Sequence, residues 1–240
     1  MSKYLVLGAS SGIGRAVCDQ LALRGDSLVL AGRDINKLEL LRSELSSSED
    51  HISVLFDADE PESIVSVFER STENGIKLDG MVYCIGRADV TPLRTLKISQ
   101  ARSMFSVNFF SFVTAVSLYA KPKYSNRGSI VGISSANSHY PQKCMSMYAA
   151  SKGAMEAAVR TMAIELADKG ISVNCVIPGA VNTDMFGKLS DDVKEMIAGK
   201  QLLGVSSPED VASSIVFLLK EGARVMTGRS VYIDGGILGQ

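Results

Sequence analysis

Short apolar runs alternate with amphipathic stretches along the whole chain. Runs typical of β-strands occur at Tyr4–Leu7, Leu28–Ala31, Ile52–Phe56, Met81–Cys84, Ser129–Ile133, Ser172–Ile177 and Ser230–Ile233. Stretches with helical spacing lie between them, at Gly14–Arg24, Ile35–Leu45, Pro61–Glu73, Ser99–Ala120, Tyr148–Asp168 and Pro208–Leu219. Strands that are apolar throughout are expected where helices cover both faces of a sheet. We therefore predict an α/β fold, a doubly wound sheet of seven parallel strands flanked by helices.

The chain has 240 residues, and no linker, repeat or low-complexity segment interrupts this alternation. We expect residues 1–240 to form a single domain that carries both binding and catalysis. The longest irregular piece runs from Gly179 to about Ser207, and within it Ser190–Ala198 is predicted to form a short helix capped by Ser190.

Charge and hydropathy narrow the function classes. The net charge is -1, with both signs spread along the chain, so nothing favours a nucleic-acid partner. No apolar stretch approaches the roughly 20 residues that span a bilayer. The apolar N-terminus enters a glycine-rich turn, which indicates a first strand rather than a signal peptide. We expect a cytoplasmic protein without a membrane partner.

Cysteine and histidine usage gives no sign of disulfides or of a metal site. Cys18, Cys84, Cys144 and Cys175 lie far apart, and three of them fall in predicted strands or helices. Buried, reduced thiols are the interpretation we adopt. With only two histidines, His51 and His139, we expect no metal.

A glycine-rich turn follows the first strand and opens the first helix. It reads Gly8-Ala9-Ser10-Ser11-Gly12-Ile13-Gly14. Gly8 permits a sharp exit from the strand, Gly12 lets the backbone approach a pyrophosphate, and Gly14 allows close packing of helix on strand. The free N–H groups and dipole of the helix favour phosphate at this end. The turn therefore predicts a dinucleotide site in a Rossmann-like fold.

Tyr148 and Lys152 stand four residues apart in the sequence YAASK and so share one face of a predicted helix. A phenol has a reference pKa near 10, and a neighbouring cation favours the phenolate. The pair is interpreted as a tuned proton donor or acceptor. Ser135 precedes Tyr148 by thirteen residues, at the carboxyl end of a predicted strand, where ligands bind in parallel sheets.

These motifs occur together and in order: GASSGIG, Asp57, Asn108, Ser135, YAASK, PGAVNT at 178–183 and DGG at 234–236. The set, which covers essentially the whole chain, resembles the single-domain subclass of the short-chain dehydrogenase/reductase family. The C-terminal half, with SSPEDVASSIVFLL and TGRSVYIDGG, is most similar to the 3-oxoacyl-carrier-protein reductases.

The resemblance implies a role for each catalytic candidate. Tyr148 would protonate a carbonyl oxygen as hydride arrives, and Ser135 would hydrogen-bond the same oxygen. Lys152 would lower the pKa of the phenol and hold the nicotinamide ribose. Asn108 would hold a water that links Lys152 to solvent, which suits a residue that is otherwise a poor choice within a helix. Ser134 competes with Ser135, and the thirteen-residue spacing favours Ser135.

The resemblance also implies a set of cofactor contacts. Asp57 would hold the adenine amino group, and Ile177 with Gly179 and Thr183 would line the nicotinamide and phosphate side. The expected cofactor-binding residues are Gly8, Ser10, Ser11, Gly12, Ile13, Gly14, Arg33, Asp57, Gly86, Tyr148, Lys152, Pro178, Gly179, Val181 and Thr183. One departure is that Tyr83-Cys84-Ile85-Gly86 stands where the family usually has Asn-Asn-Ala-Gly. Gly86 keeps the close approach, while two side-chain amides are lost.

Cofactor choice depends on the end of the second strand, where relatives that use NAD place an acidic residue. Here Gly32 takes that place and Arg33 follows, so a guanidinium is available for a 2′-phosphate. Asp34 fits better as the cap of the next helix, facing away. The alternative is that Arg33 is a surface charge paired with Asp34. We predict NADP, as NADPH, as the cofactor.

The predicted function is therefore NADPH-dependent reduction of a ketone, small or carrier-bound, with a 3-oxoacyl thioester as the leading class. The alternatives are an alcohol or sugar dehydrogenase and a sensor that binds dinucleotide without turnover. Substrate choice is expected to lie in residues 86–96, 136–147 and 182–205. The basic candidates for contact with a carrier protein are Arg87, Arg94, Arg102, Lys188 and Lys200. Asn137, His139, Cys144, Met145 and Met147 are candidates for the substrate mouth.

Two helical stretches carry apolar or small residues on more than one face, which predicts a partner helix. In Ser99–Ala120 these residues are Phe105, Phe109, Phe110 and Phe112, and in Tyr148–Asp168 they are Ala149, Ala150, Ala154, Ala157 and Ala158. The family usually pairs these helices across a two-fold axis and uses the C-terminus at a second interface. We expect a homotetramer.

Overall fold

The computed structural model describes residues 1–187, 190–220, 223 and 225–239. Within them seven strands form one sheet in the order β3-β2-β1-β4-β5-β6-β7, and every neighbouring pair is parallel. The strands are β1 (Lys3–Leu7), β2 (Ser27–Gly32), β3 (Ile52–Leu55), β4 (Leu78–Tyr83), β5 (Ser125–Ile133), β6 (Ile171–Pro178) and β7 (Ser230–Ile233). The predicted doubly wound α/β fold is confirmed.

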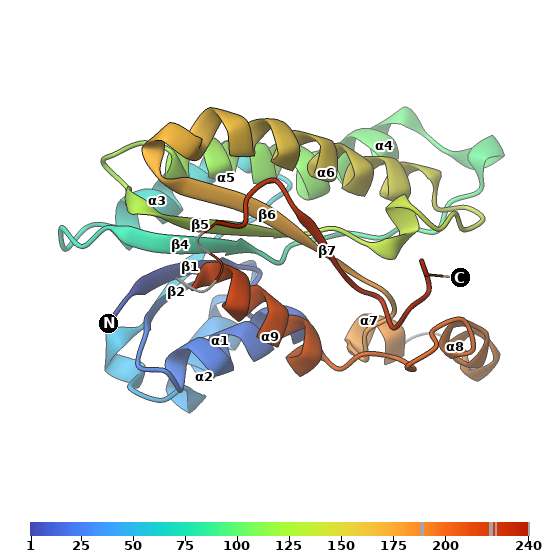
Figure 1. The fold of residues 1–240 in the computed structure, drawn as a ribbon, viewed down its shortest axis with the longest axis horizontal. Helices are drawn as coiled ribbons and strands as arrows, with labels where there is room; N and C mark the ends of the chain where they lie inside the picture. Colours follow the sequence, from blue (N-terminus) through green and yellow to red (C-terminus); the bar gives the residue numbers. More distant parts are fainter. Residues whose placement is uncertain (188–189, 221–222, 224, 240) are drawn as a thin grey trace.

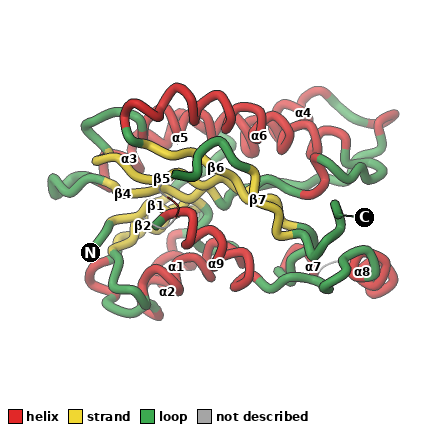
Figure 2. The backbone as a smooth tube through the Cα atoms, in the orientation of Figure 1, coloured by secondary structure: helices red, strands yellow, loops and turns green. Residues whose placement is uncertain are grey.

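Helices lie in two layers, one on each face of the sheet (Figures 1 and 2). One layer holds α1 (Gly12–Ala22), α2 (Ile35–Glu44) and α9 (Pro208–Leu219), and the other holds α3 (Ile64–Ser71), α4 (Ile98–Phe105), α5 (Ser111–Tyr119) and α6 (Ser146–Leu166). Two short helices, α7 (Asp184–Gly187) and α8 (Asp191–Ala198), follow β6 and lie beyond its carboxyl end. The predicted helix at 190–198 is therefore present.

The sheet separates two hydrophobic cores. Leu5, Tyr83 and Phe112 belong to the core beneath α3 to α6, and Val6, Leu30 and Ile215 belong to the core beneath α1, α2 and α9. Adjacent residues of β1 therefore bury their side chains on opposite faces. This explains why the central strands read as continuous apolar runs, since neither of their faces meets water.

The helical stretch predicted at 99–120 is present, but its middle is not a regular α-helix. A π-helical segment, η4 (Ser106–Phe110), separates α4 from α5. The Tyr83 hydroxyl donates to the Val107 carbonyl at 2.5 Å, and the Asn108 side chain bonds the backbone of Arg87. Such irregular turns are common at functional sites, because the wider turn re-aims side chains.

Two further findings concern the whole chain. Cys18, Cys84, Cys144 and Cys175 are all free, as predicted, and two of them are buried. No helix among the described residues is long and apolar enough to cross a membrane.

Candidate active site

The glycine-rich turn lies at the carboxyl edge of the sheet, between β1 and α1. Gly8 has a φ of 85°, a region that side-chain-bearing residues rarely adopt. A Cβ on Gly14 would lie 2.1 Å from the Gly8 carbonyl oxygen, so only glycine permits this packing. Ser11 caps α1, since its hydroxyl accepts from the Gly14 N–H and donates to the Gly8 carbonyl. The Ser11 hydroxyl is thereby used within the turn, which leaves the Ser10 hydroxyl to contact a ligand.

A cavity of about 300 Å³ opens beside this turn. Its lining comes from the ends of β1, β2, β3 and β4, which are adjacent in the sheet. Asp57 lies on its rim with an exposed carboxylate that accepts from the Asp59 N–H at 3.1 Å. The predicted residues that line it are Gly8, Ser10, Ser11, Arg33, Asp57 and Gly86. A cavity bounded by a glycine turn and a helix N-terminus fits the adenosine and phosphate half of a dinucleotide.

The basic end of this cavity carries two cations. Arg33 and Lys37 both line it, and both are exposed. Asp34 caps α2 by accepting from the N–H groups of Asn36 and Lys37, as predicted, although it also lines the cavity rather than facing away. Among the described residues no ion pair joins Arg33 to Asp34. A Cβ at Gly32 would lie 3.5 Å from the Leu38 side chain and 3.6 Å from the Ser10 hydroxyl, which also lines the cavity.

Ser135 and Tyr148 meet at the carboxyl edge of β5. Burial raises the pKa of the Tyr148 phenol, and a hydrogen bond with the Ser135 side chain opposes part of the rise. This pKa is therefore higher than the Tyr148–Lys152 spacing predicted. A phenol that keeps its proton at neutral pH is suited to act as a general acid.

The structure distinguishes Ser135 from its neighbour Ser134. Ser134 donates to the buried carboxylate of Glu156 at 2.5 Å. Ser135 begins the short turn η5 (Ala136–Ser138), where its hydroxyl accepts from the Asn137 N–H at 3.3 Å. The contact with Tyr148 therefore belongs to Ser135, in agreement with the thirteen-residue spacing.

Lys152 is almost fully buried, and its ammonium donates to the Ile133 carbonyl at 2.7 Å. Burial lowers its pKa to about 8, and nearby acidic groups that include Glu156 oppose part of the change. A Cβ on Gly86 would lie 3.3 Å from the ammonium nitrogen, so this glycine leaves room for Lys152 at the end of β4.

Asn108 lies in the π-helical segment and is fully buried. Its Oδ1 accepts from the Arg87 N–H at 2.8 Å, and its Nδ2 donates to the Arg87 carbonyl and to the Ser151 hydroxyl, both at 2.9 Å. Both amide protons are therefore used within the chain. The side chain fixes the segment after β4 against α6, next to Lys152.

Most of the remaining predicted cofactor residues lie at the end of β6 and in the loop that follows it. A Cβ on Gly12 would lie 2.8 Å from Cγ2 of Thr183, so the two loops touch. Pro178 ends β6, Gly179 packs against the Asp234 backbone, and Val181 is buried and pairs with Ser206. Ile13 packs against the core beneath α1. This loop thus lies beside the glycine turn, and no prediction from spacing alone could have placed it there.

Sequence reasoning missed three residues. Lys37 stands one helical turn after Arg33, a spacing that could have revealed it. Gln201 is buried and accepts from the Ala180 N–H at 2.6 Å, which holds the loop after β6. Glu156 stands one turn after Lys152 on α6, and a charged residue on the buried face of a helix was its available signal.

The basic residues proposed for a carrier protein have varied surroundings. Arg87 is paired with Asp59 at 2.8 Å, and the Lys200 ammonium lies 5.4 Å from the centre of the Tyr140 ring. Arg94 and Arg102 are exposed. Lys188 lies outside the described residues.

Comparison with known proteins identifies the family of the chain. A sequence model of the family described as enoyl-(acyl carrier protein) reductase matches residues 8–238. The chain belongs to the short-chain dehydrogenase/reductase family. It is an oxidoreductase of that family, with a nicotinamide dinucleotide as cofactor and an alcohol or a carbonyl as the reacting group.

Two relatives and one solved structure illustrate the range of family members to which this short-chain dehydrogenase/reductase is similar. A diacetyl reductase [(S)-acetoin forming] from Staphylococcus epidermidis is 30% identical over 260 residues, covering 99% of both chains. A 3-oxoacyl-[acyl-carrier-protein] reductase FabG from Rickettsia bellii is 29% identical and covers 98% of this chain and 95% of that one. A short-chain type dehydrogenase/reductase from Mycobacterium ulcerans superposes with a TM-score of 0.92 at 25% identity, over 100% of this chain and 90% of the other.

Proposed function

We propose that residues 1–240 form one dinucleotide-binding and catalytic unit that reduces a ketone with NADPH. The observation that carries the proposal is the meeting of Ser135 and Tyr148 at a sheet edge that also holds Lys152. The leading substrate class is a 3-oxoacyl thioester, free or carrier-bound. The support for that class is the similarity to a protein named as a 3-oxoacyl-carrier-protein reductase.

Each side chain of the site has a separate role in reduction of the carbonyl. The bound dinucleotide would supply the hydride. Tyr148 gives its proton to the oxygen, and Ser135 donates a hydrogen bond that stabilises the developing negative charge. Lys152 is held at the Ile133 carbonyl, from where its ammonium can bind ribose hydroxyls. Asn108 keeps the Gly86–Arg87 segment in place beside that ammonium.

The residues of the cavity, the glycine turn and the loop after β6 support the cofactor assignment. Gly8, Gly12 and Gly14 shape the turn for the pyrophosphate, with Ser10, Ser11 and Ile13 between them. Asp57 is available to the adenine, and Pro178, Gly179, Val181 and Thr183 line the opposite loop. Arg33 and Lys37 supply two cations where a 2′-phosphate would lie.

The test of the function is turnover by the purified protein with NADPH and a panel of ketones that includes a 3-oxoacyl thioester. Oxidation of alcohols or sugars as the dominant activity would favour the dehydrogenase instead. Dinucleotide binding without turnover of any panel member would favour a sensor.

Replacing Arg33 with alanine is expected to weaken NADPH binding by about 1.5–3 kcal/mol, the range for hydrogen bonds to charged groups, and to leave NADH binding nearly unchanged. The reason is that the guanidinium would contact only the 2′-phosphate. Fluorescence titration of both cofactors measures the change. Arg24→Ala, an exposed arginine just after α1, is the matched control. Equal losses for the two cofactors, or a wild-type preference for NADH, would contradict the assignment.

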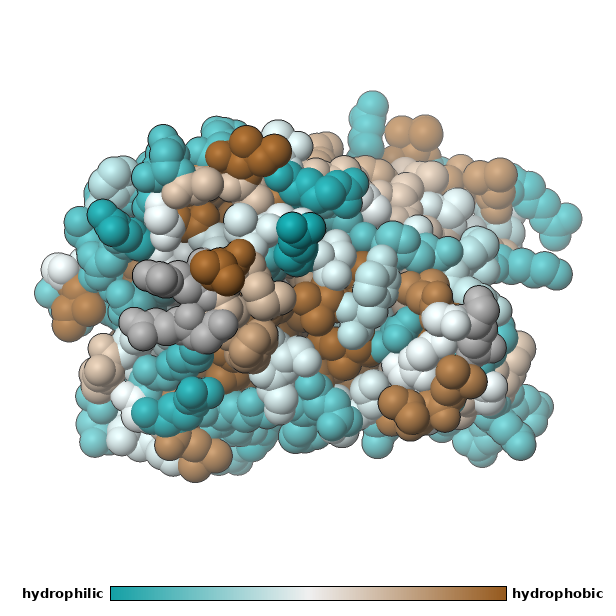
Figure 3. Space-filling model, viewed as in Figure 1, coloured by the Kyte–Doolittle hydropathy of each residue, from teal (hydrophilic) through white to brown (hydrophobic). Residues whose placement is uncertain are grey.

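A homotetramer is the proposed assembly, on two apolar surfaces. Phe105, Phe109 and Phe110 pack on one another next to α6, and Phe110 is 52% exposed, whereas Phe112 is buried against the sheet. The second surface is a hollow of about 270 Å³ between α9 and β7, lined by Phe217, Leu218, Met226 and Val231 among others. Figure 3 shows apolar residues on the face where these elements lie in front.

Light scattering at micromolar concentration is expected to give about four times the chain mass of 25.6 kDa. The Phe110→Glu variant should reduce this mass, because a charge would be buried in the interface. A wild-type monomer would refute the assembly.

A further inference from the structure

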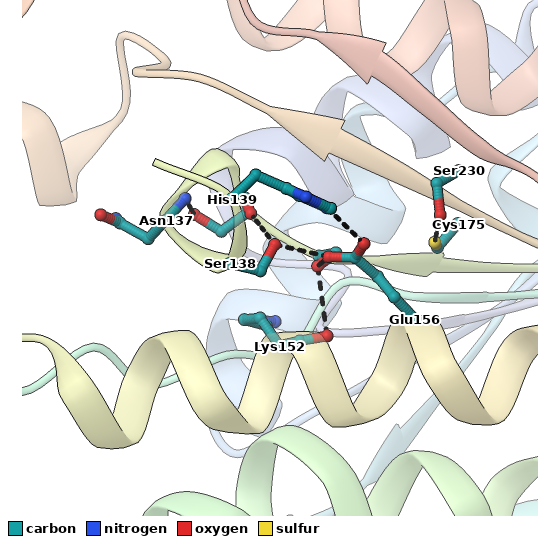
Figure 4. Close-up of polar contacts among 9 residues, drawn as sticks. Asn137, Ser138, His139, Lys152, Glu156, Cys175 and Ser230 are labelled. Atoms are coloured by element: carbon teal, nitrogen blue, oxygen red, sulfur yellow. Dashed lines mark hydrogen bonds and ion pairs between the residues drawn. The ribbon is translucent and has the colours of Figure 1, made fainter. Parts of the chain in front are cut away.

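Glu156 is a buried carboxylate that the reaction described above does not use. It stands one helical turn after Lys152 on α6, and it is 3% exposed. Burying a charge is costly unless it is paired and hydrogen-bonded. Figure 4 shows its side chain pointing from α6 toward the turn that holds Ser138 and His139.

Both carboxylate oxygens of Glu156 are occupied. Oε1 accepts from the hydroxyls of Ser134 and Ser138, each at 2.5 Å. Oε2 lies 2.7 Å from Nε2 of His139, which makes an ion pair when the imidazole is protonated. One carboxylate therefore collects three partners from a single short segment.

These partners flank Ser135 on both sides. Ser134 directly precedes it, and Ser138 and His139 follow it by three and four residues. Ser135 itself has no bond to Glu156 but caps the turn between them. The carboxylate thus ties both ends of the turn to α6, the helix that also carries Tyr148 and Lys152. The Ser135 hydroxyl lies on the tied turn, and the Tyr148 phenol lies on the helix to which the turn is tied.

The hydroxyls of Ser134 and Ser138 each have a second hydrogen-bond acceptor within reach. The Ser134 hydroxyl lies 3.4 Å from the Lys152 carbonyl, and the Ser138 hydroxyl lies 2.6 Å from the Ser135 carbonyl. Each hydroxyl has only one proton to donate. Without Glu156, each proton could pass to its backbone acceptor, and the turn would keep its local bonds. What the chain would lose is the connection of Ser138 and His139 to α6, whereas Ser134 would still reach this helix through the Lys152 carbonyl.

We propose that Glu156 is a positioning residue, whose carboxylate holds the segment from Ser134 to His139 so that the Ser135 hydroxyl stays in contact with the Tyr148 phenol. The proposal rests on the proposed function, because it assigns Glu156 to the geometry of that catalytic pair. Glu156 acts through Ser135 and touches neither substrate nor cofactor.

The first test compares Glu156→Met with Glu156→Gln. Methionine fills a similar volume but accepts no such bonds, so kcat should fall roughly 10- to 100-fold, the size of effect for a misplaced donor at a developing oxyanion. NADPH binding should stay within about two-fold of wild type, because the cofactor cavity is untouched. Glutamine keeps one oxygen for both serines and should restore most of kcat. Glu165→Met and Glu165→Gln, at an exposed position of the same helix, are the matched controls.

The second test does not need turnover. NMR with isotope-labelled tyrosine reports the ring-carbon resonance of Tyr148, assigned by its loss in Tyr148→Phe. Glu156→Met should shift this resonance, because the phenol loses its Ser135 partner, and Glu156→Gln should leave it in place. The double variant Ser134→Ala/Glu156→Met should lose less free energy of unfolding than the two single variants lose in sum, because both substitutions break the same link.

The outcomes distinguish a failure of the proposed function from a failure of the role proposed for Glu156. A wild-type protein that reduces no ketone would refute the proposed function, while the Tyr148 resonance would still decide the role of Glu156. An unchanged resonance in Glu156→Met would overturn the proposal. So would equal losses in the Met and Gln variants, or a loss of NADPH binding that matches the loss of kcat, because these point to the charge or to general folding.

Discussion

Replacing Tyr148 with phenylalanine is expected to lower turnover by at least about 100-fold while NADPH still binds. The ring and its packing are kept, and only the proton donor is lost. Because burial raises the pKa of this phenol, the proton is present at neutral pH, and its removal should be felt across the neutral range. Steady-state kinetics with the ketone found in the panel, together with a cofactor titration, make the measurement.

The control for this variant is Tyr124→Phe, at a buried tyrosine near the amino end of β4. It removes a hydroxyl far from the carboxyl edge and should leave kcat unchanged. Near-normal turnover in Tyr148→Phe would show that another group donates the proton.

Replacing Lys152 with alanine is expected to damage cofactor binding and turnover together, with a total loss in kcat/KM at least as large as for Tyr148→Phe. The ammonium is the cation beside Gly86, and hydrogen bonds to charged groups contribute about 1.5–3 kcal/mol each. Lys169→Ala, at an exposed lysine just after α6, is the control. Unchanged cofactor affinity in Lys152→Ala would contradict a ribose-binding role.

The same residue predicts a pH dependence. Burial lowers the pKa of Lys152 to about 8, so the ammonium is present below that pH and is lost above it. Since the charged form is the one that binds the ribose, kcat/KM for reduction should fall as the pH rises through about 8. A profile that rises over this range would show that the neutral amine is the active form.

Much of the geometry of the candidate active site could be predicted from local sequence, because it depends on residues close together in the chain. Gly8 and Gly14 are required by the backbone of one turn, and Asp34 caps the helix that follows it, as its position predicts. Tyr148 and Lys152 share one face of α6 because they are four residues apart. Where only such local geometry was needed, expectation and structure agree.

Predictions failed where a side chain's partner came from another element. The pKa of Tyr148 was expected to be lowered by Lys152, yet burial dominates and the ammonium is held by the Ile133 carbonyl. The helical stretch at 99–120 was found, yet its pattern gave no sign of the π-helical turn to which Tyr83 and Arg87 bond. Spacing along one helix carries no information about what a neighbouring strand will donate or accept.

The sequence by itself determined the order of strands and helices, the parallel sheet and the place of the dinucleotide turn, because apolar periodicity and glycine positions record burial and backbone needs residue by residue. Only the tertiary structure decided that Ser134 binds Glu156 while Ser135 meets Tyr148, and that Thr183 touches Gly12. These contacts join elements far apart in the chain. Their geometry is fixed by how helices pack on the sheet, which no local pattern encodes.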